Sequence, residues 1–489
     1  MILHFEPTQS LESRPRLCGF FSFMNYSEAV NYLYSLGNGV LTAKLGLRNI
    51  TALLNFLGDP HKKFKSILIA GTNGKGSVAA FCESVLRASG YRTGLYTSPH
   101  LIQIEERICV GGVMIAADVF ARLTEEIKDA VSALMNENGS TAKNFPLDRH
   151  PTYFEMVTAI AFKYFAEQQI DIAVLEVGLG GRLDATNVVD PLVDVITNVD
   201  YDHQKYLGNS IEEIAAEKAG TIKPRSYEMA SSDWALRNPN WVRVENLLPV
   251  VLCNANETVL QIIKKRCQET GAVLLRVLED SEYEAEADSL GYFRLRLSCS
   301  LESGVEIALP LPGEHQVLNA LTAIRTLEIL KSFGYQIKRQ NVAEGIAKTC
   351  WPGRLEVLNS QPRIIFDGAH NPAAAQKVRD YIKQFFELNQ IVMIYGSMRD
   401  KAIREIAREL FPLARQVILT QPEWERAANP IEIQNLLPEF RPVIRLSRSV
   451  REALDIAHQL ASENDTLLIV GSLFLVGDAK KCIQNTVLA

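Results

Sequence analysis

The chain has 489 residues, which is too long for one hydrophobic core and predicts two or three domains. Its composition is ordinary for a globular protein, and the formal net charge of -6 gives no reason to expect nucleic acid or an anionic membrane as a partner. The eight cysteines lack metal-ligand spacing and no apolar run approaches the roughly 18 residues of a membrane span, so we expect a cytoplasmic protein with reduced thiols.

The first residues predict little regular structure. Residues 1–25 mix acids with bases and show no basic-then-apolar order, so we expect a variable N-terminal extension and not a secretory signal. Residues 26–57 predict helices that are interrupted at Gly37-Asn38-Gly39.

The clearest motif lies at residues 66–77. An apolar run, Ser66 to Ala70, predicts a buried strand, and the glycine-rich turn that follows opens an amphipathic helix that stops at Gly90. Strand, glycine loop and helix bind phosphate through backbone N–H groups and the positive helix end, while Lys75 reaches the outer phosphates. The stretch departs in two places from the common phosphate-loop pattern G-x-x-x-x-G-K-(S/T). Ile69 replaces the first glycine, and the hydroxyl residue is Ser77, one position beyond its usual place directly after Lys75.

This variant, Gly-Thr-Asn-Gly-Lys-Gly-Ser, resembles the ATP-dependent amide ligases of the Mur ligase superfamily, and among them the dihydrofolate synthase/folylpolyglutamate synthase family. The resemblance implies an α/β fold with a P-loop central domain of Mur-ligase type and a Rossmann-like C-terminal domain. It also implies that Asn73, Gly74, Lys75, Gly76 and Ser77 bind ATP and that Lys75 is catalytic. The alternative is a glycine-rich turn with a surface lysine.

Three strand ends are candidates for a magnesium site. Glu176 ends the apolar run that starts at Ile170, which is the usual place of a magnesium-binding acid downstream of a P-loop; an exposed strand-end glutamate is the alternative. The resemblance implies that Ser98 and His203 are further ligands. Judged from the local sequence alone, Ser98 is equally well explained as a turn residue before Pro99. A histidine in the position of His203 is more often structural, because Mg²⁺ prefers oxygen ligands.

Two segments are candidates for contacts with the acid substrate. Thr152 and Glu155 have the spacing of a capping box, which alone explains both residues. The glycines between Val177 and Asn187 permit close approach of the backbone to a ligand. The resemblance implies substrate contacts at Thr152, Tyr153, Phe154, Glu155, Leu183, Asp184 and Ala185.

A second capping box, Ser210 with Glu213, predicts a helix that runs through Lys218 to Gly220. Lys218 is explained locally as a cation at a helix C-terminus. The resemblance implies instead a catalytic, carbamylated lysine. Residues 225–250 depart from the family pattern, and we expect a surface insertion there.

The remaining candidates lie around a predicted hinge. Gln316 and Asn319 begin a long helix, where a polar first turn is one explanation and adenine contact is the one that the resemblance implies. Trp351-Pro352-Gly353-Arg354 predicts a domain boundary, and an arginine there can close over the phosphates of ATP. Beyond it, strands expected at 363–366, 391–395, 416–420 and 466–470 alternate with helices. Asp367 and His370, which follow the strand expected at 363–366, are suited to binding ATP and the transferring phosphate as catalytic residues.

We therefore expect a P-loop domain at 26–349, a linker at 350–361 and a ligase domain at 362–489. The resemblance, which covers nearly the whole chain, implies an ATP- and Mg²⁺-dependent, mostly monomeric ligase of folate biosynthesis and one-carbon metabolism. It would add L-glutamate to dihydropteroate or to reduced folates (tetrahydrofolate polyglutamates) through an acyl phosphate.

Two other functions stay open. A peptidoglycan-precursor ligase of the same superfamily is disfavoured by the wording Asp-Gly-Ala-His-Asn-Pro at 367–372 and by the lack of a nucleotide-sugar domain before the P-loop. A non-catalytic P-loop switch protein is disfavoured because it would not need a second α/β domain carrying Asp367 and His370.

Overall fold

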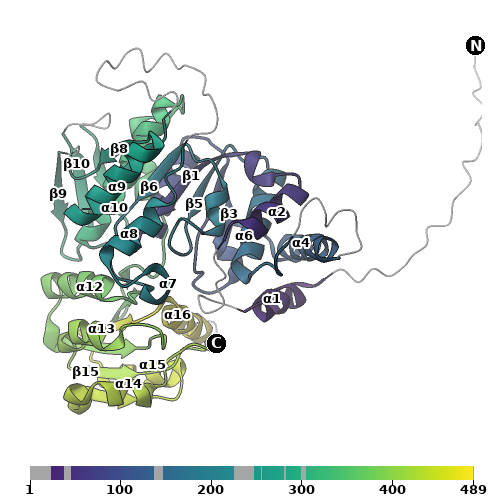
Figure 1. Ribbon diagram of the computed structural model, residues 1–489. Coiled ribbons are helices and arrows are strands. Elements are labelled where there is room, and N and C mark those ends of the chain that lie inside the picture. Colours follow the sequence, from purple (N-terminus) through teal and green to yellow (C-terminus); the bar gives the residue numbers. More distant parts are fainter. Residues whose placement is uncertain are drawn as a thin grey trace, which may run out of the picture.

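The computed structural model describes residues 24–37, 46–136, 147–224, 247–254, 256–279, 282–298 and 304–487. Most of the expected N-terminal extension and residues 225–246 of the expected insertion lie outside these ranges. Figure 1 shows two α/β parts, with the C-terminal one, green to yellow, below the N-terminal one. A parallel-sheet N-terminal domain with a separate C-terminal α/β domain confirms the predicted fold class.

The N-terminal domain is built on one large sheet. Its central strands are parallel, whereas β3 and β4 form an antiparallel edge. In spatial order the strands are β4 (Val113–Met114), β3 (Ile108–Val110), β2 (Thr93–Tyr96), β5 (Ile172–Glu176), β1 (Lys65–Ala70), β6 (Val193–Ile196), β7 (Pro249–Leu252) and β8 (Val273–Arg276). Because β2, β5, β1 and β6 are parallel neighbours, the segments that follow them meet at one edge of the sheet.

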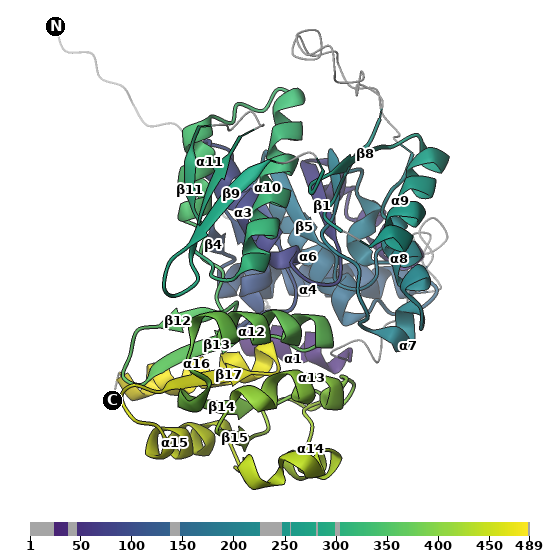
Figure 2. The same ribbon diagram turned by 90° about the vertical axis from the view of Figure 1, so that its left-hand side faces the viewer.

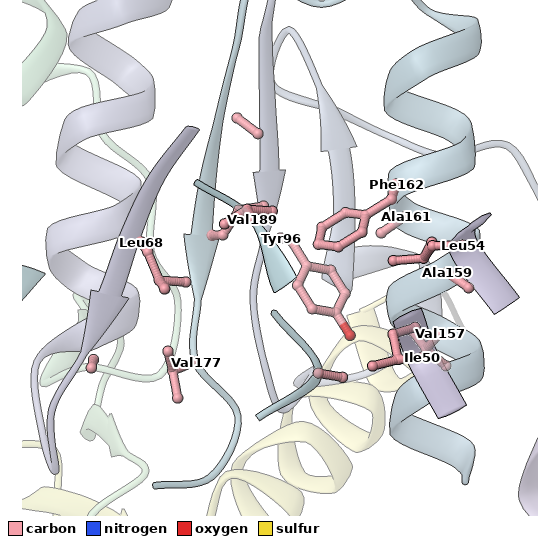
Figure 3. Close-up of a cluster of buried hydrophobic side chains, with 14 of the residues drawn as sticks. Ile50, Leu54, Leu68, Tyr96, Val157, Ala159, Ala161, Phe162, Val177 and Val189 are labelled. Atoms are coloured by element: carbon pink, nitrogen blue, oxygen red, sulfur yellow. The ribbon is translucent and has the colours of Figure 1, made fainter. Parts of the chain in front are cut away.

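Helices cover both faces of this sheet, and β1 shows why. Leu68 and Ala70 face one core, and Ile67 and Ile69 face the other, so the strand is apolar from Ile67 to its end. Figure 3 shows part of the first core, where the rings of Tyr96 and Phe162 lie close together. The helices of this domain are α1 (Tyr26–Ser35), α2 (Arg48–Phe56), α3 (Lys75–Ala88), α4 (Ala117–Met135), α6 (Tyr153–Glu167), α7 (Gln204–Leu207), α8 (Ile211–Ala219), α9 (Glu257–Thr270), α10 (Glu314–Ser332) and α11 (Arg339–Ala347).

A small antiparallel sheet lies beside the second core. Its strands are β11 (Glu306–Ala308), β10 (Phe293–Leu297) and β9 (Tyr283–Ala287), in that spatial order. Phe293, Leu295 and Leu297 alternate with exposed arginines and join the core that α3 and α10 cover. This sheet therefore extends the N-terminal domain.

The C-terminal domain has a parallel sheet with one antiparallel edge strand, and Figure 2 shows it beneath the first domain. Its strands, in spatial order, are β12 (Glu356–Leu358), β13 (Arg363–Asp367), β17 (Thr466–Val470), β14 (Ile391–Tyr395), β15 (Gln416–Leu419) and β16 (Ile444–Leu446). Its helices are α12 (Pro372–Phe385), α13 (Ile403–Leu410), α14 (Pro430–Leu436), α15 (Val450–Leu460) and α16 (Leu473–Val487).

Three features of the structure differ from the sequence predictions. The predicted linker contains β12, which pairs with β13, and β16 was not predicted. Both strands are three residues long and only partly buried, so neither gives an apolar run. Pro249 and Val250, placed in the expected insertion, are buried in β7. Both predicted capping boxes are present, and none of the described helices is long and apolar enough to cross a membrane.

Candidate active site between the two domains

The predicted phosphate loop joins β1 to α3 and is held by the segment after β6. Asn73 N donates to Asn198 Oδ1 at 2.7 Å, and Thr197 Oγ1 donates to the Asn73 carbonyl at 2.6 Å. Gly74 has φ +83°, and a Cβ there would lie 2.4 Å from Asn319 Oδ1. The glycine is therefore required by both conformation and space. Thr197 and Asn198 were not singled out from the sequence, because their role depends on strand pairing.

Two lysines converge on this loop. Lys75 Nζ donates to the carbonyl of Gly71 at 3.1 Å and to that of Thr72 at 3.2 Å, and Lys218 Nζ donates to the same Gly71 carbonyl at 2.8 Å. Lys218 is buried, and burial together with the nearby Lys75 lowers the pKa of its amine to about 7. A substantial fraction of this amine is therefore neutral at physiological pH.

The predicted magnesium ligands lie at the end of β5 (Glu176) and after the ends of β2 (Ser98) and β6 (His203). Glu176 is buried, and its Oε2 accepts from the backbone N–H of Ser98 at 2.9 Å. Burial raises the pKa of Glu176, an effect that Lys75 and the Ser98 N–H oppose. Burial and Lys401 lower the pKa of His203 to about 3, so its imidazole is neutral. The sheet thus brings Ser98 and Glu176 together.

Hydrogen bonds and an ion pair connect the two domains beside this loop. Asn73 and Asn371 exchange amide hydrogen bonds, at 2.9 and 3.4 Å. Asn371 Nδ2 also donates to Asp202 Oδ2 at 3.2 Å, and Lys401 Nζ lies 2.8 Å from Asp202 Oδ1. Burial opposes ionisation of Asp202, but His370, His203 and Lys401 hold its pKa well below the usual range. Neither Asp202 nor Lys401 was a candidate from the sequence.

A cavity of about 240 Å³ lies between the domains. The N-terminal domain contributes to its wall Ser98, Thr152, Tyr153, Phe154, Glu155, Leu183, Asp184, Ala185 and His203. The C-terminal domain contributes His370, Lys401, Arg426 and Leu473, together with Trp424 and Phe474, whose rings stack at a centroid distance of 4.4 Å. Tyr34 of α1 packs edge-on against Trp424, so an aromatic contact also joins the domains.

Two carboxylates on the cavity wall already have internal partners. Glu155 Oε2 accepts from Arg149 at 2.7 Å, and Thr152 donates to the same oxygen through its backbone N–H at 2.7 Å. Asp184 accepts from the N–H groups of Gly178 and Leu179 and from Thr186. These acids therefore fix the shape of the wall.

The predicted nucleotide contacts form two pairs, Gln316 with Asn319 and Arg354 with Asp367. Asn319 Nδ2 donates to Gln316 Oε1 at 2.9 Å, which fixes the Asn319 amide above Gly74. Asp367 accepts from the backbone N–H groups of Leu355 and Ala369, both at 2.8 Å. Burial raises the pKa of Asp367 and lowers that of Arg354, while each charge favours ionisation of the other.

An aromatic contact at this end of the site was missed by the sequence analysis. The Trp351 indole packs on the start of α3, where a Cβ on Gly76 would lie 2.7 Å from the ring. Nothing in the local sequence indicates this contact, since it joins residues 275 positions apart.

Comparisons with known proteins agree on one relationship. A model described as "Mur ligase, glutamate ligase domain" matches residues 353–473. The chain is 32% identical over 470 residues to dihydrofolate synthase/folylpolyglutamate synthase of Bacillus subtilis, covering 94% of this chain and 100% of that protein. It is 33% identical to a probable bifunctional folylpolyglutamate synthase/dihydropteroate synthase of Haloferax volcanii, covering 94% of this chain but only 50% of that protein.

Solved structures give the same result. The Mycobacterium tuberculosis folylpolyglutamate synthase complexed with ADP and AMPPCP superposes with a TM-score of 0.79 at 30% identity, covering 94% of this chain and 98% of that one. The Escherichia coli FolC complex with DHPP and ADP gives a TM-score of 0.77 at 29% identity, with coverage of 94% and 98%.

Proposed function

The chain belongs to the dihydrofolate synthase/folylpolyglutamate synthase family of ATP-dependent ligases, and we propose that it joins L-glutamate to the carboxylate of dihydropteroate, of a tetrahydrofolate, or of both. The observation that carries this proposal is the cavity between the domains, because side chains of both domains line it and it lies beside the phosphate loop. The other two functions considered from the sequence are set aside by family membership.

The chemistry requires activation of the acid. A carboxylate is a poor acyl donor, so the γ-phosphoryl of ATP is transferred to it, and the amine then attacks the acyl phosphate and expels phosphate. Positioning and charge neutralisation dominate such phosphoryl transfers. We assign neutralisation of the phosphates to Lys75, with the backbone N–H groups from Asn73 to Ser77 around them. His370, 3.6 Å from Asp202, is assigned to the transferring phosphate together with Asp367.

Nucleotide binding is assigned to two pairs of residues, Gln316 with Asn319 and Arg354 with Asp367. Asn319 lies directly above Gly74, and Gln316 fixes its amide, so this pair is suited to an adenine edge. Arg354 and Asp367 lie at the start of the C-terminal domain, so their contact with ATP would couple nucleotide binding to the position of that domain.

The donor set suits a magnesium ion. Glu176 and Ser98 supply oxygen ligands from adjacent strand ends, and His203 is a neutral imidazole, so each predicted ligand has a lone pair available. Among the described residues, no group of three or more His, Cys, Asp or Glu side chains is arranged to hold a metal ion by itself, so the remaining positions would be filled by phosphate oxygens and water. Bound there, Mg²⁺ would neutralise negative charge on ATP.

We propose that Lys218 is carbamylated. Carbamylation needs a neutral amine, and the lowered pKa of Lys218 supplies one. The modification replaces a second cation next to Lys75 by an anion, which removes the repulsion between the two amines.

Further parts of the proposal concern partners and location. The walls at 152–155 and 183–185 would hold the pterin-containing acid. We propose a monomer that acts in the cytoplasm on small molecules, without a nucleic-acid or membrane partner.

A substrate assay tests the proposed reaction. The protein is incubated with Mg²⁺-ATP, L-glutamate and either dihydropteroate or tetrahydrofolate, and ADP is measured with the glutamylated product. ADP release that requires both acid and amine supports the proposal, and comparison of the two acids shows which reaction occurs. Nucleotide binding without turnover on either acid would contradict it.

A further inference from the structure

Arg426 is a cation of the cavity wall whose charge is poorly neutralised. Its side chain is 18% exposed, and its Nε is buried without a hydrogen-bond partner in the described structure. Its contact with an acid joins Nη1 to Asp400 Oδ1 at 3.5 Å, well beyond the roughly 2.8 Å of a strong charge-assisted bond. The guanidinium therefore retains capacity to bind an anion.

The other cations of the wall have closer partners. Lys401 lies 2.8 Å from the buried Asp202 carboxylate. Arg107 donates through Nε to His100 Nδ1 at 2.9 Å, and its guanidinium lies 5.5 Å from the centre of the Tyr153 ring, on the N-terminal side. Lys401 and Arg426 are the two of these three cations that belong to the C-terminal domain, and of the two it is Arg426 that lacks a close carboxylate.

The backbone holds Arg426 in place. The segments after β14 and β15 are bonded to each other, because Arg399 N donates to the Arg426 carbonyl at 3.0 Å and Ala428 N donates to the Ser397 carbonyl at 2.8 Å. An isolated bridge between Met398 and Ala427 adds to this contact. Since the Arg426 carbonyl and the two residues that follow it are bonded to the segment after β14, the side chain starts from a fixed point on the cavity wall.

The position of Arg426 indicates which anion it takes. The amine of the incoming amino acid must reach the acyl phosphate, which we place beside the Asp202, His370 and Lys401 cluster. Within the described residues, the acid beside Arg426 is Asp400, the chain neighbour of Lys401, and not Asp202 of that cluster. A group bound at Arg426 would therefore lie beside the cluster and not in it, which suits the side-chain carboxylate of an amino acid whose amine is at the acyl phosphate.

We propose that Arg426 binds the side-chain carboxylate of the incoming amino acid and thereby selects a dicarboxylic amino acid. This inference rests on the proposed ligase function and names the residue that discriminates its amine substrate. Arg426 takes no part in bond making, because the new C–N bond and the leaving phosphate belong to the other end of the amino acid. A planar guanidinium matches a carboxylate with two parallel hydrogen bonds, which an amide cannot reproduce.

The test separates amino-acid selection from acid activation. Wild type, Arg426→Gln and the control Arg404→Gln, an exposed arginine of α13, are assayed with ATP, the folate acid and hydroxylamine, which traps an acyl phosphate as a hydroxamate. Steady-state constants are then measured with L-glutamate and with L-glutamine, its uncharged isostere. Hydroxamate formation shows that each variant is folded and activates the acid.

We expect Arg426→Gln to form hydroxamate and to lose roughly 30-fold or more in kcat/KM for glutamate, with little change for glutamine. Arg404→Gln should match wild type with both amines. An unchanged preference for glutamate in Arg426→Gln would overturn the inference, and so would equal losses with both amino acids, which indicate contact with the α-carboxylate. Absence of hydroxamate from wild type would instead overturn the ligase function, and this inference with it.

Discussion

The ion pair between Asp202 and Lys401 gives the sharpest prediction about how the two domains hold together. Both side chains are only 10% exposed, and the pair joins the segment after β6 to the segment after β14. Removing one partner leaves a buried charge without compensation, which costs about 3–5 kcal/mol, whereas removing both avoids that penalty. We expect the lower end of this range because Asp202 retains Asn371 and His370 as neighbours.

A double-mutant cycle measures the effect. Asp202→Asn, Lys401→Met and the double variant are unfolded in urea and followed by tryptophan fluorescence. Each single change should lower the free energy of unfolding by about 3 kcal/mol, and the double variant should lose about 2 kcal/mol less than the sum. A coupling below about 0.5 kcal/mol would refute the reasoning, because the two charges would then not depend on each other in the folded protein.

Four further outcomes follow from the site and the core. Lys75→Ala should lose about 10³ or more in turnover, and near-normal ADP release would contradict its place on the phosphates. Glu176→Gln should abolish turnover while the melting temperature without ATP barely changes; the reverse pattern would make this acid structural. His370→Ala should slow single-turnover ADP release more than it weakens ATP binding, and normal single-turnover chemistry would remove its assigned role. Burial raises the pKa of Asp194 to about 7, so the folded chain holds a proton that the unfolded chain loses between about pH 4 and 7. Wild-type stability should therefore fall as pH rises through this window, by at most about 4 kcal/mol, and Asp194→Asn should flatten that dependence; equal slopes would contradict it.

Local patterns predicted much of the fold. The apolar run of β1, the glycine turn and the start of α3 lie within a few residues of one another, so their spacing alone specifies strand, loop and helix. The capping boxes at Thr152 and Ser210 are also local and form as predicted. Strands β12 and β16 were missed because each has only three residues and is partly exposed, which is too short to show the alternation of apolar and polar residues typical of a strand.

The site was predicted less completely, for a physical reason. The parallel sheet brings Ser98 next to Glu176, and Lys75 and Lys218 both donate to the Gly71 carbonyl of the phosphate loop, a contact that the sequence did not indicate. Their catalytic and metal-binding roles remain predictions. Lys401 and Arg426 were not found because each follows a strand of the second domain in a segment without a distinctive motif. Their place on the cavity wall arises from packing between domains, which no spacing in the sequence encodes.

Transfer of isotopic oxygen tests the central claim most directly. The folate acid is labelled with ¹⁸O in its carboxylate and incubated with Mg²⁺-ATP and L-glutamate, and the released inorganic phosphate is examined by mass spectrometry. Ligation through an acyl phosphate predicts one ¹⁸O atom in each phosphate per amide formed, because the carboxylate oxygen leaves with the phosphoryl group. Amide formation with unlabelled phosphate, or with the label in AMP, would contradict the account.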